Sequence, residues 1–271
     1  DVYQGAPTPL TGFMAAGVKV AAFGALLRML YVTLGGARWD WTPMLWVISI
    51  ITMLVGSIIA VAQSDIKRML AYSAIAQAGF ILIGVIAASP AGLAAAMFYL
   101  AAYSFITIGA FAIVTMVRDA TGEANDLEKW KGLGKKSPWI GAIFASFMLA
   151  LAGIPLTTGF VAKFAVFSAG IASGAAVLVI VGVIASVISA FFYARVIVLM
   201  FFVEPTERTA DVVVPSAFTT IALIVKLKAE APSGMGYGLL VLGVIVGGTI
   251  GAVLAKRVEM TKMPELVAAM H

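Results

Sequence analysis

The sequence predicts an all-α fold: a polytopic transmembrane bundle of about seven or eight helices, one of them discontinuous around Gly153–Gly159. Three observations predict it. Of the 271 residues, 62% are hydrophobic and only 11% are charged, against roughly 25% charged residues in ordinary soluble domains. Apolar runs of about 20 residues, long enough to cross a bilayer as helices, follow one another along the chain. Lysines and arginines collect in the loops between these runs.

The composition also excludes several kinds of site. The formal net charge of +5 comes from loop residues of the kind that face the cytoplasm in membrane proteins, so we expect no nucleic-acid partner. The chain has no cysteine, which excludes disulfides, thiolate metal sites and iron–sulfur ligation within it. Its single histidine, His271, cannot form a metal cluster alone. We therefore expect neither a metal nor a cofactor bound by this chain.

The apolar runs define the helices in order. They are Leu10–Val32, Met44–Ala62, Met69–Ala88, Ala91–Val117, the interrupted run Trp139–Gly170, Ala175–Val203, a short run Val212–Val225, Tyr237–Ala255, and Met263–His271, which starts another. With the N-terminus inside, most loop lysines and arginines fall on the inner side, which predicts a cytoplasmic start. The chain begins without methionine and ends within an apolar run, so we expect a fragment at both ends.

The interrupted run carries the strongest functional signal. Pro155 removes a backbone donor, and Gly153 and Gly159 weaken the helix on either side of it. Such a break persists in a membrane only where it is buried in protein or lines a wet cavity. Lys163 follows about one helical turn later, where a charge costs at least roughly 2.5–3.5 kcal/mol. These features predict a functional lysine rather than one that reaches a lipid headgroup.

Lys19 is the second ionisable group inside an apolar run. Its own helix offers no carboxylate partner, and desolvation penalises an unpaired charged amine. Lys19 could therefore exchange protons, or a carboxylate from elsewhere in the fold could keep it charged. The residues alone leave both possibilities open.

The third span adds further polar groups. Lys67 lies just before it, where anchoring at the membrane interface competes with proton transfer. Tyr72, Ser73 and Gln77 are spaced to follow one helix face, where they could hold water between lysines or bond to other helices. Thr107 in the fourth span allows the same two interpretations. The polar loop Arg118–Pro138 is typical of a solvated connection, although Trp130 among its lysines could rest on headgroups or on a neighbouring subunit.

Together these stretches resemble the antiporter-like membrane subunits of respiratory complex I, most closely the subunit called N in bacteria. The resemblance covers residues 1–220. It is carried by DVYQGAPTP (Asp1–Pro9), GVKVAAFG around Lys19, SDIKRMLAYSAIAQAG (Ser64–Gly79) and LAGIPLTTGFVAKF (Leu151–Phe164). It implies that the first span corresponds to the family's eighth helix and the interrupted run to its discontinuous twelfth.

The resemblance also implies roles. Lys19 would be the central or connecting proton-relay site and Lys163 the terminal one, towards the outside. From their own positions we also expect Lys67, Tyr72 and Gln77 along the relay. Gln77 stands where relatives often have histidine, which would weaken proton transfer there. The family's earlier helices, with a partner glutamate and another lysine, are missing. Other membrane subunits of complex I, the lipid bilayer and protons would be the partners, in a bacterial inner membrane. NADH, flavin, iron–sulfur clusters and quinone would belong to partner subunits.

Residues 221–271 resemble a different family. From Gly236 to His271 the chain looks like the membrane part of the proton-translocating nicotinamide nucleotide transhydrogenase beta subunit, with LAKRVEMTKMPEL as the distinctive loop. That resemblance implies that His271 belongs to a proton path and that a junction lies within residues 217–226.

The predicted function is that of a proton-translocating membrane subunit of an NADH:quinone oxidoreductase, a translocase subunit without its own redox centre. Three alternatives remain open: a cation/proton antiporter, a transhydrogenase membrane subunit, and a non-functional fused fragment whose lysines are stranded.

Overall fold

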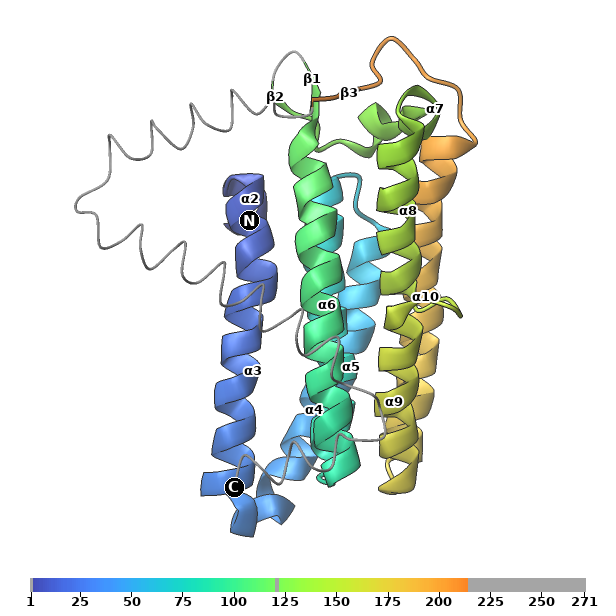
Figure 1. The fold of residues 1–271 in the computed structure, drawn as a ribbon. Helices are drawn as coiled ribbons and strands as arrows, with labels where there is room; N and C mark the ends of the chain where they lie inside the picture. Colours follow the sequence, from blue (N-terminus) through green and yellow to red (C-terminus); the bar gives the residue numbers. More distant parts are fainter. Residues whose placement is uncertain (1, 120–121, 214–271) are drawn as a thin grey trace, which may run out of the picture. The chain divides into compact units, whose positions relative to one another are not determined.

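The computed structural model describes residues 2–119 and 122–213, nearly all within one compact unit, Asp1–Val212. Figure 1 shows this unit as a bundle of long helices. The predicted runs Val212–Val225, Tyr237–Ala255 and Met263–His271, the predicted junction and His271 itself lie partly or wholly outside the described residues.

The first predicted span is a continuous helical stretch, Thr8–Thr33. After the short α1 (Val2–Gly5), it consists of α2 (Thr8–Phe13), the π-helical turn η1 (Met14–Val18), α3 (Lys19–Arg28) and a second π-helical turn, η2 (Met29–Thr33). A 3₁₀ turn, η3 (Gly35–Ala37), leads into the next helix. The π-helical turns arise within an otherwise regular stretch, a feature that is frequent at functional sites.

The other predicted spans are also confirmed as helices. They are α4 (Arg38–Val61), α5 (Ile66–Ile86), α6 (Pro90–Met116), the pair α8 (Pro138–Ala152) and α9 (Thr158–Ala172), and α10 (Ala176–Phe201). Asp65 and Ser89 start α5 and α6 as N-caps, because their side chains accept hydrogen bonds from backbone N–H groups of the first turn. Within the described residues, five helical stretches are long and apolar enough to cross a membrane, as an integral multi-pass protein requires.

The outer face of the bundle is apolar, unlike that of a soluble protein. The outer face of α4 exposes Ile51, Val55 and Ile58, each about half accessible. The interior is largely apolar but also holds polar groups, among them Lys67, Ser73, Gln77, Thr107, Lys163 and Ser189. An apolar exterior is what a surrounding bilayer requires, and ionisable groups buried inside such a bundle indicate where function lies.

Helix α5 lies at the centre of this interior. Of its span, 78% is buried, against 28–50% for the other four long spans. It packs against α4, α6 and α9. Gly56 of α4 allows the close approach of α4 to α5, because a Cβ there would lie 2.8 Å from the backbone nitrogen of Ala76. The polar side chains of α5 therefore face several helices at once.

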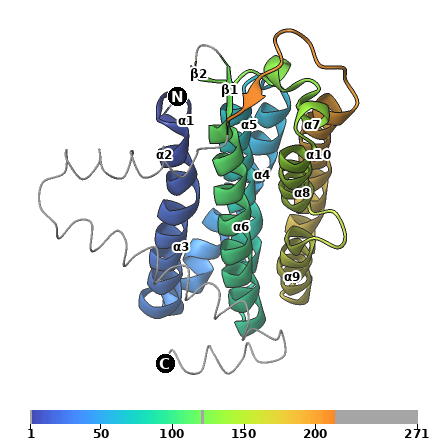
Figure 2. The same cartoon turned by 45° about the horizontal axis from the view of Figure 1, so that its top comes forward.

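The loops at one end of the bundle form a small ordered layer, seen at the top of Figures 1 and 2. Strands β1 (Val117–Asp119), β2 (Gly122–Glu123) and β3 (Asp211–Val212) make an antiparallel sheet in the order β2-β1-β3. Arg118 pairs with Glu123 on one side and with Asp211 on the other. The 3₁₀ turn η4 (Leu127–Trp130) and α7 (Leu133–Lys136) complete the layer.

The structure corrects the interpretation of Trp130. Its side chain is fully buried, its indole Nε1 donates to the carbonyl of Ala124 at 2.8 Å, and its ring packs on Phe144 at 4.9 Å between centroids. Trp130 therefore anchors the loop to α8 and is not available to headgroups or to a neighbouring subunit. The sequence pattern suggested otherwise because surrounding lysines indicate exposure, whereas the turn η4 directs the indole inward.

Candidate functional site

The break between α8 and α9 is built as the Pro and Gly residues predict. α8 ends on Gly153, which adopts a left-handed conformation with φ of +81°. α9 restarts at an N-cap, Thr157, whose hydroxyl accepts a hydrogen bond from the backbone N–H of Phe160 at 3.3 Å. Gly159 packs so closely on α8 that a Cβ would lie 1.8 Å from the carbonyl oxygen of Ala150. The last carbonyls of α8 are thereby left without helical partners.

Lys163 binds these freed carbonyls. Its side chain is 4% exposed, and its Nζ donates to Leu151 O at 3.1 Å, to Ala152 O at 2.9 Å and to the Ser186 hydroxyl at 2.9 Å. The Nζ also lies 4.8 Å from the centre of the Phe80 ring. Every partner is electrically neutral, and no salt bridge reaches Lys163 from the part of the chain that the structure describes.

A cluster of hydrogen bonds adjoins Lys163 on the α5 side. The Gln77 amide donates to the same Leu151 carbonyl at 3.1 Å and to the Tyr193 hydroxyl at 3.3 Å. The Tyr99 hydroxyl donates to Gln77 Oε1, and the Ser73 and Tyr193 hydroxyls share a hydrogen bond. Gln77 therefore connects α6, α10 and the break.

Lys19 occupies the first residue of α3, directly after the π-helical turn η1. Its Nζ donates to the carbonyl of Ala74 at 2.5 Å and to the Tyr103 hydroxyl at 3.2 Å, and it lies 4.6 Å from the centre of the Tyr103 ring. Lys19 lines a pocket of about 410 Å³ together with Tyr3, Arg68 and Tyr72. Its charge also has only neutral hydrogen-bond partners among the described residues, so no carboxylate keeps it charged there.

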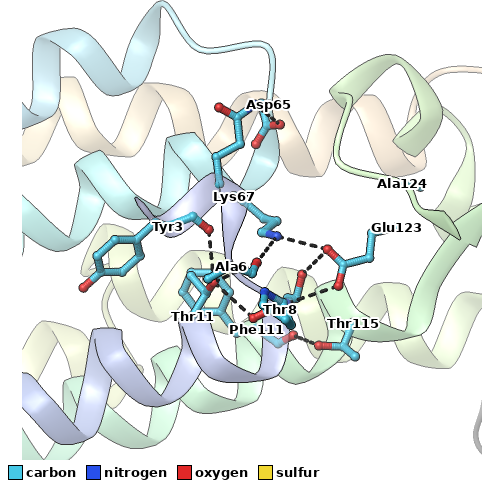
Figure 3. A network of polar contacts seen from close by, with 12 residues as sticks. Tyr3, Ala6, Thr8, Thr11, Asp65, Lys67, Phe111, Thr115, Glu123 and Ala124 are labelled. Atoms are coloured by element: carbon cyan, nitrogen blue, oxygen red, sulfur yellow. Dashed lines mark hydrogen bonds and ion pairs between the residues drawn. The ribbon is translucent and has the colours of Figure 1, made fainter. Parts of the chain in front are cut away.

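Lys67 has a different environment, shown in Figure 3. Its side chain is 1% exposed and its Nζ donates to Ala6 O at 2.8 Å and to Glu123 Oε2 at 3.0 Å. Glu123 also accepts bonds from the Thr8 N–H at 3.2 Å and the Thr8 hydroxyl at 2.6 Å, at the first residue of α2. Burial alone would raise the pKa of Glu123, but the bonds from Thr8 and Lys67 outweigh it and lower that pKa. Anchoring of Lys67 in lipid headgroups is therefore wrong.

The structure brings most of the predicted residues toward α5. Gln77 and Lys163 meet at the Leu151 carbonyl, whereas Tyr72 lines the pocket of Lys19 and does not share the side of α5 that Ser73 and Gln77 use. The residues that the sequence did not single out are Tyr99, Tyr103, Glu123, Ser186 and Tyr193. The two tyrosines of α6 are four residues apart in an apolar helix. This spacing places both hydroxyls on one helix face, and it could have identified them from the sequence.

The fold and the site define a class: a multi-pass membrane protein with cationic groups inside the bundle, an arrangement typical of proteins that move ions or protons. The chain belongs to the NADH:quinone oxidoreductase/Mrp antiporter transmembrane family, whose model matches residues 1–189.

Curated relatives carry the name of one member of that family. NADH-quinone oxidoreductase subunit N 3 of Streptomyces griseus is 63% identical over 235 residues, which are 87% of this chain and 42% of that protein. Subunit N of Thermobifida fusca is 52% identical over 273 residues, covering 100% of this chain and 48% of that protein. The chain thus spans less than half the length of these relatives. The Thermobifida match extends past residue 220 and lends no support to the transhydrogenase resemblance.

Two solved structures are similar in fold. Respiratory complex I from Thermus thermophilus with bound aureothin contains a chain with 31% identity and a TM-score of 0.68, covering 91% of this chain and 51% of that one. The Mrp complex from Dietzia sp. DQ12-45-1b contains a chain with 29% identity and a TM-score of 0.64, covering 68% and 34% respectively. Both similarities extend over more than two thirds of this chain.

Proposed function

We propose that this chain is the proton-translocating part of a membrane subunit of an NADH:quinone oxidoreductase. The observation that carries the proposal is Lys163, buried at a helix break with only carbonyl, hydroxyl and ring partners. A cation in that position is costly, and moving protons is a direct reason for placing it there. The subunit N relatives support the choice of complex.

The chemistry of the site fits proton exchange rather than redox work. An amine bonded only to neutral acceptors can release a proton without leaving a carboxylate unpaired beside it. Lys19 has the same kind of partners and opens on a pocket of about 410 Å³, where protons could arrive through water. Electron transfer, NADH oxidation and quinone reduction would be supplied by partner subunits, whose redox energy would drive the lysines.

We further propose that the end with the small sheet faces the cytoplasm of a bacterial inner membrane. Loop cations gather at that end, where Lys129, Lys131, Lys135 and Lys136 lie in and around η4 and α7. Basic loops favour the cytoplasmic side. The N-terminal residues lie at the same end, since Thr8 binds Glu123 there.

Cation/proton antiport is the second candidate, and the similarity to a chain of an Mrp complex favours it. The two functions differ in their dependence on sodium and on redox partners. Sodium-driven proton exchange by the full-length protein in liposomes, without partner subunits, would favour the antiporter.

The test is Lys163→Met in the full-length protein within its complex, reconstituted in liposomes. We expect NADH-driven proton translocation to fall about a hundredfold, the lower end of the range that general acid–base groups contribute. Lys135→Met is the matched control, because Lys135 is at the surface in α7 and pairs with the exposed Glu204. Unchanged proton translocation with Lys163→Met would contradict the proposal and favour the interpretation as a non-functional fragment with stranded lysines.

A further inference from the structure

Arg195 is the only charged residue of α10, and it lies on the apolar outer face of that helix. Ile184, Val187 and Phe191 precede it at spacings of three and four residues, and each is more than half exposed. Side chains at such spacings share one helix face. Because α10 continues past Arg195 to Phe201, the arginine lies roughly 9 Å short of the end of the helix. A charge at that position needs polar partners.

The end of α4 supplies two of these partners. Arg195 Nη1 donates to the carbonyl of Val61 at 3.2 Å and to that of Gln63 at 3.5 Å. The last carbonyls of a helix lack partners within it, and the helix dipole favours a cation beside them. The buried Ser57 and Ser189 hydroxyls share a hydrogen bond of 2.9 Å between the same two helices. The guanidinium is therefore held at the contact between α4 and α10.

The other side of the guanidinium faces outward. A guanidinium carries five N–H donors, but in the described part of the chain the hydrogen bonds of Arg195 come from Nη1 alone. The residue is exposed, and none of the ion pairs within residues 2–119 and 122–213 includes it. The N–H groups of Nε and Nη2 are thus open to an acceptor from outside the chain.

The depth of Arg195 in the bundle indicates which acceptor fits. The connection from α4 to α5 includes Asp65, which pairs with Asp126 in the loop layer beside the small sheet. Arg195 therefore lies where the apolar spans meet the polar loops, the depth at which lipid headgroups lie. On the side away from the loops, Val55 and Ile58 of α4 are about half exposed. A phosphodiester matches the guanidinium fork, and an acyl chain matches the apolar surface.

We propose that Arg195 binds the headgroup phosphate of an anionic phospholipid, in the leaflet on the side of the small sheet. One acyl chain lies along the exposed apolar side chains of α4 and α10. The headgroup supplies the negative charge that Arg195 lacks among the described residues, and basic positions between transmembrane helices bind such headgroups. The bound lipid links the two helices through the arginine. The site does not depend on proton translocation and goes beyond the proposed function.

The first test is a high-resolution density map of the full-length protein in its complex, in nanodiscs that contain phosphatidylglycerol. We expect a phosphate within hydrogen-bonding distance of Arg195 Nε or Nη2, with chain density beside α4 and α10. The phosphate should disappear in Arg195→Gln. A carboxylate of a neighbouring subunit on the guanidinium, or no headgroup there, would overturn the proposal.

The second test counts the phosphatidylglycerol retained by the detergent-solubilised complex in native mass spectrometry. Arg195→Gln should weaken one tight site by about tenfold, the loss of one charge-assisted hydrogen bond, and Arg195→Lys should weaken it less. Arg118→Gln is the matched control, because Arg118 is also exposed and donates to a helix-end carbonyl, that of Thr115 at 3.2 Å, but lies in β1 of the loop layer.

Three outcomes of the second test would refute the site. Equal loss of lipid in Arg195→Gln and Arg118→Gln would show that Arg195 has no special role. Equal retention of phosphatidylcholine would remove the need for a negative headgroup. Displacement of the lipid by inorganic phosphate would show that the acyl chain contributes nothing.

Discussion

Lys67 and Lys163 are both almost completely buried amines, yet their partners differ in kind. Lys67 faces the carboxylate of Glu123 at 3.0 Å and a backbone carbonyl. Lys163 has carbonyls, a hydroxyl and a ring but no carboxylate among the described residues. The first arrangement is an ion pair at the end of the bundle, and the second is a cation held by dipoles beside a helix break.

The difference shows how one residue type can serve two purposes. A nearby carboxylate favours the charged amine and makes its loss expensive, because the carboxylate would then be buried without its partner. Dipoles hold the charged amine without that penalty. In the structure Lys67 holds α1 and α2 against the loop. Proton exchange by Lys163, and proton relay by Lys67, both stay predictions.

The largest expected effect comes from giving Lys163 the kind of partner that Lys67 has. Ser186→Asp would place a carboxylate near Nζ, and at about 4 Å such a pair is worth roughly 4 kcal/mol in a partly polar interior. We expect proton translocation in liposomes to fall at least about a hundredfold, since each 1.36 kcal/mol is worth tenfold.

Ser186→Asn is the control for that variant. It has nearly the same size and hydrogen-bonding reach as aspartate but no charge, so most of the proton translocation should remain. If aspartate and asparagine lowered the rate equally, crowding rather than charge would explain the loss and the comparison of the two lysines would fail.

The second effect comes from removing the carboxylate from Lys67. Glu123→Gln leaves the Lys67 charge buried without a counter-charge, which should lower the free energy of unfolding by roughly 3 kcal/mol. Thermal unfolding of the protein in lipid nanodiscs measures the loss, and hydrogen exchange should localise it to α1 and α2.

Glu204→Gln is the reference variant for that measurement, because it breaks an ion pair at the surface. Glu204 is 84% exposed and pairs with Lys135 at 2.5 Å, so its loss should cost under about 1 kcal/mol. Equal destabilisation by the two variants would mean that burial of Lys67 adds nothing to the strength of its ion pair.

The smallest effect is a dependence of stability on acid. The pKa of Glu123 lies below its ordinary value of 4.5 in the folded protein, because hydrogen bonds from Thr8 and Lys67 outweigh the effect of burial. The unfolded chain therefore binds a proton more readily, and the contribution of Glu123 is complete above about pH 4.5 and is lost as the pH falls through the lowered pKa. The difference in thermal midpoint between the unsubstituted protein and Glu123→Gln should narrow below pH 4.5. A difference in thermal midpoint that stays constant down to strongly acidic pH would contradict the lowered pKa of Glu123.

Much of the fold could be predicted from the sequence, because a helix that crosses the hydrocarbon of a bilayer must be apolar over about 20 residues. The six spans before residue 204 and the break at Gly153–Gly159 follow from apolar runs and from the placement of proline and glycine. Lys19 and Lys163 were conspicuous because an amine is rare in such runs.

The partners of those lysines were much harder to predict. Tyr99 and Tyr103 fit an apolar helix by their rings, so their hydroxyls give no signal in the hydropathy pattern. Glu123 lies 56 residues from Lys67 in a loop whose other charges lie near the surface. Trp130 was misplaced for a related reason, since its neighbours in sequence are charged while its contacts in space are Ala124 and Phe144. The environments of these side chains are set by tertiary contacts, which the local sequence pattern does not reveal.

The turn that joins α8 to α9 exposes a leucine in an unfavourable backbone conformation. It protrudes from the bundle in Figures 1 and 2, and Leu156 in it is 105% exposed with a φ of +76°. A left-handed backbone costs a leucine roughly 1–3 kcal/mol, which glycine would avoid. The turn therefore combines a strained backbone with an exposed apolar side chain, which hydrocarbon tolerates better than water does.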